Sequence, residues 1–283
     1  MRPDDDDVLQ TLFDYAAADE NIRAALLEGS RAFGKVDQYS DYDITYVTRS
    51  NEPYFGGTVL PFLKKSFGEI AVMQTPDNGD PCDVYTHLIQ FSSGIRIDLT
   101  FNSAKFLNRV PLESATAVLL DKDGRFANIM PPSDADFWMK QPSAIEFLHH
   151  CNEFWWCSPY VAKAAARGQT IHALEIFSER LRNEYRIMLS YLAGARNDWA
   201  CVNLGKHCTD LKRFLPLHET YYYEVLINSY TRANGIVAAL DTLMTKYNAL
   251  AAAVADALGY VYDFLEAAKT IKFIQERFYN QST

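Results

Sequence analysis

Residues 26–47 read LLEGSRAFGKVDQYSDYDITYV and place a Gly-Ser pair ten residues ahead of two aspartates that flank a single tyrosine. In a β-strand successive side chains point to opposite faces, so Asp41 and Asp43 would share one face. Two neighbouring carboxylates repel each other unless a cation lies between them. The stretch therefore predicts a strand, a turn and a second strand whose first residues carry a cation site.

The first half of the chain has the pattern of a mixed α/β unit. Short apolar runs bounded by turn residues, several with period-two alternation, indicate β-strands. The predicted strands are residues 22–29, 41–48, 69–75, the two arms of a hairpin within 86–101, and 117–121, and the predicted helices are residues 4–18 and 57–67. In the second arm of the hairpin, Asp98 shares its face with Arg96 and Thr100.

The second half of the chain is helical in pattern. It begins after a proline-containing break at residues 128–137, where Ser143 and Glu146 have the spacing of a capping box. The predicted helices are residues 144–166, 170–193, 207–214, 219–258 with a break, and 262–279. We therefore predict an α+β fold, with a mixed β-sheet and flanking helices in residues 1–138 and an all-α helical bundle in residues 139–283.

The composition limits the class of partner. The net charge of −9 and the isoelectric point near 5.2 argue against nucleic acid, because its binding depends on clustered Lys and Arg. No segment reaches the roughly 18 uninterrupted apolar residues of a membrane span, and MRPDDDDVLQ at the start lacks an apolar signal region. The five cysteines contain no CxxC pair, which disfavours a disulfide framework. We expect a cytoplasmic monomer with a small cationic substrate and no membrane partner.

Three acids and a Gly-Ser turn together indicate a phosphate chemistry. Asp98 adds a third carboxylate from a separate strand to the pair at positions 41 and 43, and three such oxygen donors suit Mg²⁺. Glycine lets a phosphate approach the backbone closely, and the serine adds a hydroxyl donor. Each part alone is common in ordinary turns and strand ends, but their occurrence in this order predicts nucleotidyl transfer.

Several segments along the chain carry a family resemblance. They are LLEGSRA, SDYDITY, RIDLT, LLDKD, QPSAIEF, CNEFWW with SPYVAKA, and LGKH. Together they resemble the aminoglycoside 6-adenylyltransferases, the streptomycin-modifying branch of the nucleotidyltransferase superfamily, over about residues 8–275. The resemblance implies transfer of AMP from ATP to a drug hydroxyl, with the 6-hydroxyl of streptomycin as the expected acceptor. It also implies a nucleotidyltransferase domain at 1–138 that binds ATP and Mg²⁺, and a helical domain at 139–283 that contacts the aminoglycoside and ATP.

The resemblance assigns roles to the first-half motifs. Gly29 and Ser30 match the triphosphate-binding turn. Asp41, Asp43 and Asp98 match the Mg²⁺ ligands and the catalytic acids. Asp98 is also the expected base for the attacking hydroxyl, although lowering of the hydroxyl pKa by the metal is an open alternative.

Four further residues are expected to contact the nucleotide. Ser40 resembles a second phosphate contact, and Arg31 could neutralise charge on the triphosphate, with a salt bridge as the open alternative. Lys206, in LGKH, is similar to a lysine by which the helical half reaches ATP, and Lys163 is a second candidate. For both lysines, a solvated surface position is the alternative.

An acid beside two tryptophans, in NEFWW, is the candidate drug site. Glu153 with Trp155 and Trp156 would offer charge and a flat apolar wall to a guanidinium-bearing sugar. Burial between helices is the alternative for either tryptophan. Two other functions stay open: adenylation of a protein, and a non-catalytic nucleotide-binding relative, which would normally lack one of the three aspartates.

Overall fold

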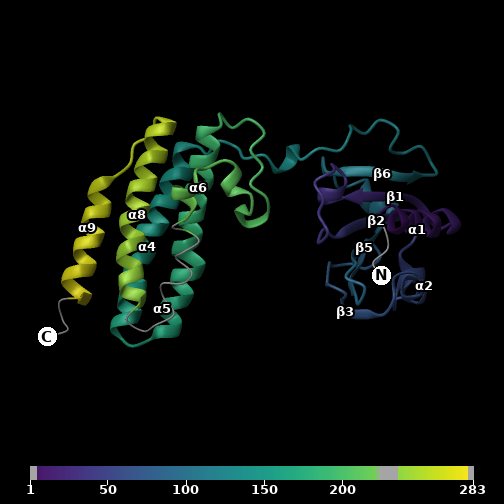
Figure 1. Ribbon diagram of the computed structural model, residues 1–283, viewed down its shortest axis with the longest axis horizontal. Helices are drawn as coiled ribbons and strands as arrows, with labels where there is room; N and C mark the ends of the chain where they lie inside the picture. The colour runs from purple at the N-terminus through teal and green to yellow at the C-terminus, as the bar shows by residue number, and fades with distance from the viewer. Residues whose placement is uncertain (1–4, 222, 224–234, 280–283) are drawn as a thin grey trace. The chain divides into compact units, whose positions relative to one another are not determined.

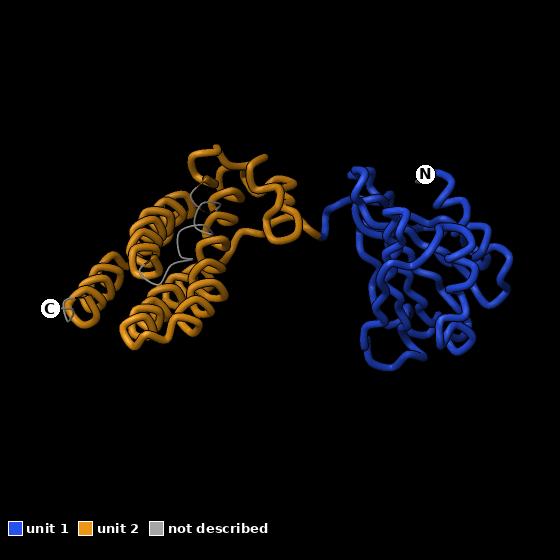
Figure 2. Tube along the Cα trace, turned by 60° about the horizontal axis from the view of Figure 1, so that its bottom comes forward, with its two compact units in different colours: residues 1–136 blue, residues 137–283 orange. Residues whose placement is uncertain are grey.

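The computed structural model describes residues 5–221, 223 and 235–279. The chain divides into two compact units, Met1–Asp136 and Phe137–Thr283 (Figures 1 and 2). This division falls close to residue 138, where the composition of the sequence changes from mixed α/β to helical. The domain functions that the resemblance implies stay predictions.

A six-stranded mixed sheet forms the centre of the first unit, in the order β3-β4-β5-β2-β1-β6. The strands are β1 (Ile22–Glu28), β2 (Tyr42–Thr48), β3 (Ile70–Gln74), β4 (Val84–Phe91), β5 (Arg96–Ser103) and β6 (Thr116–Asp121). β2 and β5 pair in parallel, and the other neighbours pair antiparallel, including the predicted hairpin of β4 and β5. The expected α+β class is therefore confirmed.

One face of the sheet is covered by the two longer helices of this unit. α1 (Asp5–Ala18) and α2 (Leu60–Phe67) pack their apolar residues into the same core as Tyr42, Ile44 and Tyr46 of β2. The side chains of β2 that alternate with these, beginning with Asp43, face the opposite side. A smaller core around Val47 and Phe126 covers part of that side, together with α3 (Ala104–Leu107).

The second unit is a helical bundle, as Figure 1 shows. Its helices include α4 (Ala144–Ala166), α5 (Thr170–Ile176), α6 (Arg182–Arg196), α8 (Gly235–Leu258) and α9 (Phe264–Ile274), with π-helical segments at Phe177–Leu181 and Gln275–Tyr279. The capping box predicted at Ser143 and Glu146 is present at the start of α4. The rings of Phe154 and Tyr247 stack within the bundle core, with their centres 3.5 Å apart.

Two predicted helices differ from the structure. The segment 170–193 is interrupted by the π-helical turn Phe177–Leu181. Residues 207–214 form no α-helix, because His207 and Cys208 have positive φ angles of 55° and 62°, and two 3₁₀ turns take its place. Of the predicted helix 219–258, residues 222 and 224–234 lie outside the described residues.

Within the described part of the chain, no helix combines the length and the apolar character needed to cross a bilayer.

Candidate active site

Gly29 brings the turn after β1 against an acid of β2. It begins a 3₁₀ turn, Gly29–Arg31, with a φ of 69°, a value that residues with a Cβ rarely adopt. A Cβ at this position would lie 2.6 Å from Oδ2 of Asp43. Glycine is therefore required twice, by the backbone conformation and by the close approach of the carboxylate.

Three acids lie side by side across the central strands. Asp43 of β2 is in register with Asp98 of the parallel strand β5 and with Glu28 of the antiparallel strand β1. Neighbouring strands lie about 4.8 Å apart, so the central carboxyl group has an acid on each side. Asp41 lies immediately before β2. The sequence analysis missed Glu28, although it directly precedes Gly29 in the quoted stretch.

The central acid holds its proton more tightly than usual. Burial is the largest of the causes that raise the pKa of Asp43 to about 6. The negative charges of Asp98, Asp41 and Glu28 follow, in decreasing order of effect. Burial also raises the pKa of Glu28, while a 2.6 Å hydrogen bond donated by Thr45 Oγ1 to Glu28 Oε2 opposes that rise. Burial and the neighbouring negative charges therefore both favour the protonated form of Asp43.

Arg96 brings a positive charge to this cluster. Its Nε and Nη2 donate to the two carboxylate oxygens of Asp98 at 3.0 and 2.9 Å, and Nε lies 3.4 Å from Asp41 Oδ2. Such two-bond pairs are among the stronger ionic contacts. The sequence placed Arg96 on the same strand face as Asp98 but gave it no role. The spacing Arg-x-Asp was the available signal.

The donor chemistry of the cluster suits Mg²⁺, which prefers carboxylate oxygens. The negative charges of the neighbouring acids, which add to the effect of burial on the pKa of Asp43, point the same way. Across residues 5–221, 223 and 235–279, however, no group of three or more His, Cys, Asp or Glu side chains is gathered for a metal. Arg96 contacts two of the three predicted ligands instead, Asp41 and Asp98. The acids thus fit Mg²⁺ in their charge and in their type of donor atom, and their assignment as metal ligands stays a prediction.

Arg31 and Ser40 hold the loop that joins the turn to β2. The buried guanidinium of Arg31 donates to the carbonyls of Asp41 and Ser40 at 2.8 and 2.9 Å, pairs with Asp5 at 2.8 Å and covers the Tyr42 ring. The Ser40 hydroxyl accepts from the Asp37 amide at 2.9 Å. These contacts favour the salt-bridge alternative for Arg31 over a contact with the triphosphate.

The predicted lysines occupy different settings in the helical unit. Lys206 is exposed in the 3₁₀ turn Lys206–Cys208, directly after Gly205, whose φ is 69°. Lys163 is half-buried in α4, with Nζ 4.8 Å from the centre of the Tyr160 ring.

The three residues of the predicted drug site do not face one space. Trp155 is buried and donates from Nε1 to Tyr262 OH at 3.1 Å. Glu153 accepts from Cys157 Sγ at 3.4 Å and lies 3.9 Å from Arg180 Nη1. Trp156 is 63% exposed. Trp155 therefore packs in the core, which was the stated alternative to a drug contact.

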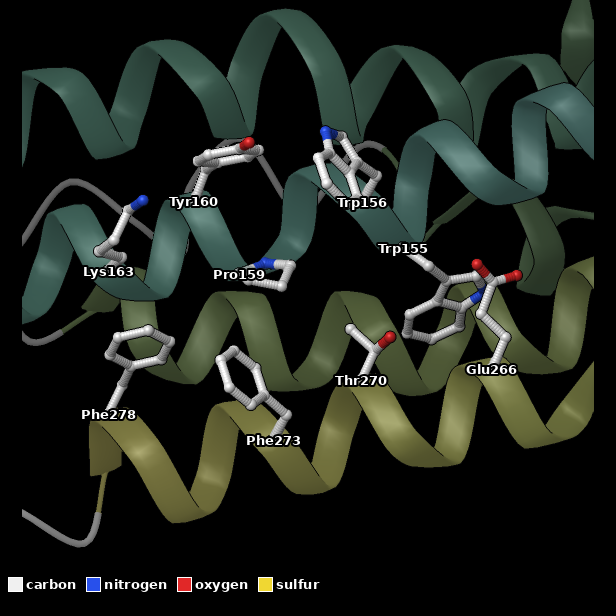
Figure 3. A pocket seen from close by; sticks show the side chains of 9 residues that line it. All are labelled: Trp155, Trp156, Pro159, Tyr160, Lys163, Glu266, Thr270, Phe273 and Phe278. Carbon is white, nitrogen blue, oxygen red and sulfur yellow. The ribbon is translucent and has the colours of Figure 1, made fainter.

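A pocket between α4 and the C-terminal helical segments gathers several of these side chains (Figure 3). It has a volume of about 380 Å³ and is lined by Trp155, Trp156, Pro159, Tyr160, Lys163, Glu266, Thr270, Phe273 and Phe278. The acidic side chain in this lining is Glu266, and Glu153 is not part of the lining. The sequence analysis did not identify Glu266. No local motif could have found Glu266, because α9 meets α4 only in the folded bundle.

Comparison with known proteins identifies relatives over most of the chain. The sequence model of a family described as streptomycin adenylyltransferase matches residues 1–277. An aminoglycoside 6-adenylyltransferase of Staphylococcus aureus is 32% identical over 218 residues, covering 74% of this chain and 76% of that protein. One of Bacillus subtilis (strain 168) is 30% identical over 271 residues, covering 90% of this chain and 92% of that protein. A crystal structure of an aminoglycoside 6-adenyltransferase from Bacillus subtilis aligns over 97% of this chain and 98% of that chain, with 26% identity and a TM-score of 0.46.

Proposed function

The chain belongs to the streptomycin adenylyltransferase family, a family of nucleotidyltransferases, and we propose that it transfers AMP from ATP to a hydroxyl group of an aminoglycoside and releases pyrophosphate. The 6-hydroxyl of streptomycin is the proposed acceptor. The observation that carries the proposal is the close approach of the Gly29 turn to Asp43, which is itself in register with Asp98. The proposal is supported because glycine allows a phosphate to approach the turn closely and carboxylates are donors that Mg²⁺ prefers.

The proposal gives each part of this cluster a task. The Gly29–Ser30 turn binds the triphosphate of ATP, and Asp41, Asp43 and Asp98 hold Mg²⁺. When bound, Mg²⁺ neutralises charge on the phosphates and lowers the pKa of the attacking hydroxyl. Asp98 takes up the proton of that hydroxyl. Its two hydrogen bonds from Arg96 hold the carboxylate in one orientation.

The direct test is a product assay. The purified chain is incubated with ATP, Mg²⁺ and a panel of aminoglycosides, and mass spectrometry measures addition of AMP to each drug. Adenylated streptomycin is the expected product, with Asp43→Asn as the inactive control. Expression in a sensitive bacterium should raise streptomycin resistance for the wild type only. A chain that adenylates proteins but no drug would replace this proposal with the protein-modifying alternative.

A further inference from the structure

The pocket in the helical unit is large enough to hold part of a small molecule. Its volume of about 380 Å³ falls within the range of ligand sites, about 300 to 1,000 Å³. α4 provides one wall, and α9 with the segment Gln275–Tyr279 provides the other (Figure 3). Its lining lies wholly in the second unit.

Exposed aromatic rings make the walls of this pocket flat and apolar. Trp156 is 63% exposed and Phe273 is 51% exposed, although side chains of this size usually bury most of their surface. Trp156 meets Tyr160 edge-on, with ring centres 6.1 Å apart, so the two rings pack against each other on this wall. A planar group that stacked on these rings would remove apolar surface from water.

The pocket carries opposite charges at its two ends. Figure 3 shows Glu266 at the end near Trp155, and Lys163 at the other end near Phe278. Asn152 Nδ2 donates to Glu266 Oε1 at 3.0 Å and so orients the carboxylate. Within the residues that the structure describes, Glu266 makes no ion pair. A ligand with a cationic group would supply that missing partner.

We propose that this pocket binds a guanidinium group of the aminoglycoside, with the Glu266 carboxylate as its ionic partner and Trp156 as its stacking surface. A guanidinium pairs with a carboxylate through two hydrogen bonds and also stacks on an aromatic face, whereas an ammonium lacks the flat face. The inference rests on the proposed function for the identity of the ligand. Lys163 repels a second cation and so directs the guanidinium to the Glu266 end.

A matched pair of variants on the full chain tests the site. Calorimetric titration with streptomycin, without ATP, measures affinity for the wild type, Glu266→Gln and Glu153→Gln. Loss of one charge-assisted contact should weaken binding to Glu266→Gln by about tenfold or more. Glu153→Gln removes an acid of the same charge outside the pocket and should bind as the wild type does. Lys163→Gln should bind streptomycin as tightly or more tightly, and an aminoglycoside with amines only should bind the wild type more weakly.

A second variant covers the case in which Glu266→Gln fails to fold, since Glu266 also pairs with Asn152. Thr270→Phe fills the pocket and leaves the carboxylate in place, and it should abolish streptomycin binding while circular dichroism stays unchanged. The site is overturned if Glu266→Gln and Thr270→Phe are folded and bind streptomycin as the wild type does, or if Glu153→Gln loses as much affinity as Glu266→Gln.

The product assay separates this site from the proposed function. Streptomycin adenylation that Glu266→Gln leaves unchanged, in both Michaelis constant and turnover, would overturn the site and leave the proposed function standing. Glu266-dependent binding of streptomycin without any AMP transfer would support the site and contradict the proposed function. A wild type that neither binds nor adenylates streptomycin would overturn both.

Discussion

At the scale of single residues, Gly29 links backbone conformation to the position of the Asp43 carboxylate. Gly29→Ala places a Cβ 2.6 Å from Asp43 Oδ2 and keeps a φ of 69°. The left-handed conformation alone costs about 1 to 2 kcal/mol of stability. The displaced carboxylate should lower AMP transfer by about tenfold or more in addition.

Gly34→Ala is the matched control for this substitution. Gly34 also has a positive φ, 79°, but a Cβ there meets nothing within 4 Å. Gly34→Ala should therefore lose as much stability in urea denaturation as Gly29→Ala does, but keep its AMP transfer. Equal loss of activity in the two variants would show that backbone strain, and not the contact with Asp43, causes the loss of AMP transfer in Gly29→Ala.

The raised pKa of Asp43 makes stability depend on pH. Because the pKa is about 6 in the folded chain and about 3.9 in an unfolded one, the folded state favours the protonated carboxyl. This contribution is present below pH ~4 and is lost as the pH rises towards ~6. Asp43→Asn carries no such charge, so its stability relative to the wild type should rise between pH 4 and 7.

The gain in stability of Asp43→Asn relative to the wild type should reach about 1 to 2 kcal/mol, after allowance for the partial exposure of the Asp43 side chain. Urea denaturation of both proteins across this pH range, with a chelator present, measures it. The same variant should lose nearly all AMP transfer. A stability difference that does not change with pH would contradict the raised pKa of Asp43.

Residue pairs show which parts of the site the sequence could predict. Strand periodicity placed the carboxylate of Asp98 on its correct face, because period two is a local property of the backbone. The acid of the pocket could not be found this way. Glu153 is close to Trp156 in the chain, but Arg180 and Cys157 contact it. Glu266 reaches the pocket only because α9 packs beside α4.

At the scale of elements, helix propensity and packing oppose each other at Gly194 in α6. A Gly→Ala change inside a helix normally stabilises it by about 1 kcal/mol. Here a Cβ would overlap the ring of Trp199, whose amide donates to the Gly194 carbonyl at 2.9 Å. Overpacking costs about 1 to 3 kcal/mol, so Gly194→Ala should destabilise the second unit.

In a Trp199→Ala background, Gly194→Ala should have the opposite effect on stability. Without the ring, Gly194→Ala should stabilise by up to about 1 kcal/mol, as propensity alone predicts. Chemical denaturation of the four proteins in this double-mutant cycle measures both effects. Stabilisation by Gly194→Ala in the wild-type background would mean that Trp199 moves aside at little cost.

Elements with strong local signals were predicted well, and those shaped by special backbone angles were not. Ser143 and Glu146 marked the start of α4, because a capping box is complete within four residues. Nothing in the pattern of residues 207–214 signalled the positive φ angles of His207 and Cys208. Left-handed non-glycine residues depend on their tertiary surroundings. The helix predicted there was wrong for that reason.

At the scale of the whole molecule, the two units have separate cores. Every buried residue of the bundle core lies between Phe147 and Ile274, in the second unit, and the two cores of the sheet lie within the first. Each unit therefore has the means to unfold on its own. We expect two thermal transitions in calorimetry.

A matched pair of substitutions assigns these transitions. Ile97 in β5 and Ile274 in α9 are both fully buried, one in each unit. Replacing either with Val costs about 1 kcal/mol, which lowers the melting temperature of a unit this size by about 3 °C. Ile97→Val should lower one transition and Ile274→Val the other. Because a ligand stabilises the part that binds it, streptomycin in the pocket between α4 and α9 should raise the transition that Ile274→Val lowers. A single transition that both substitutions lower equally would mean that the two cores unfold together.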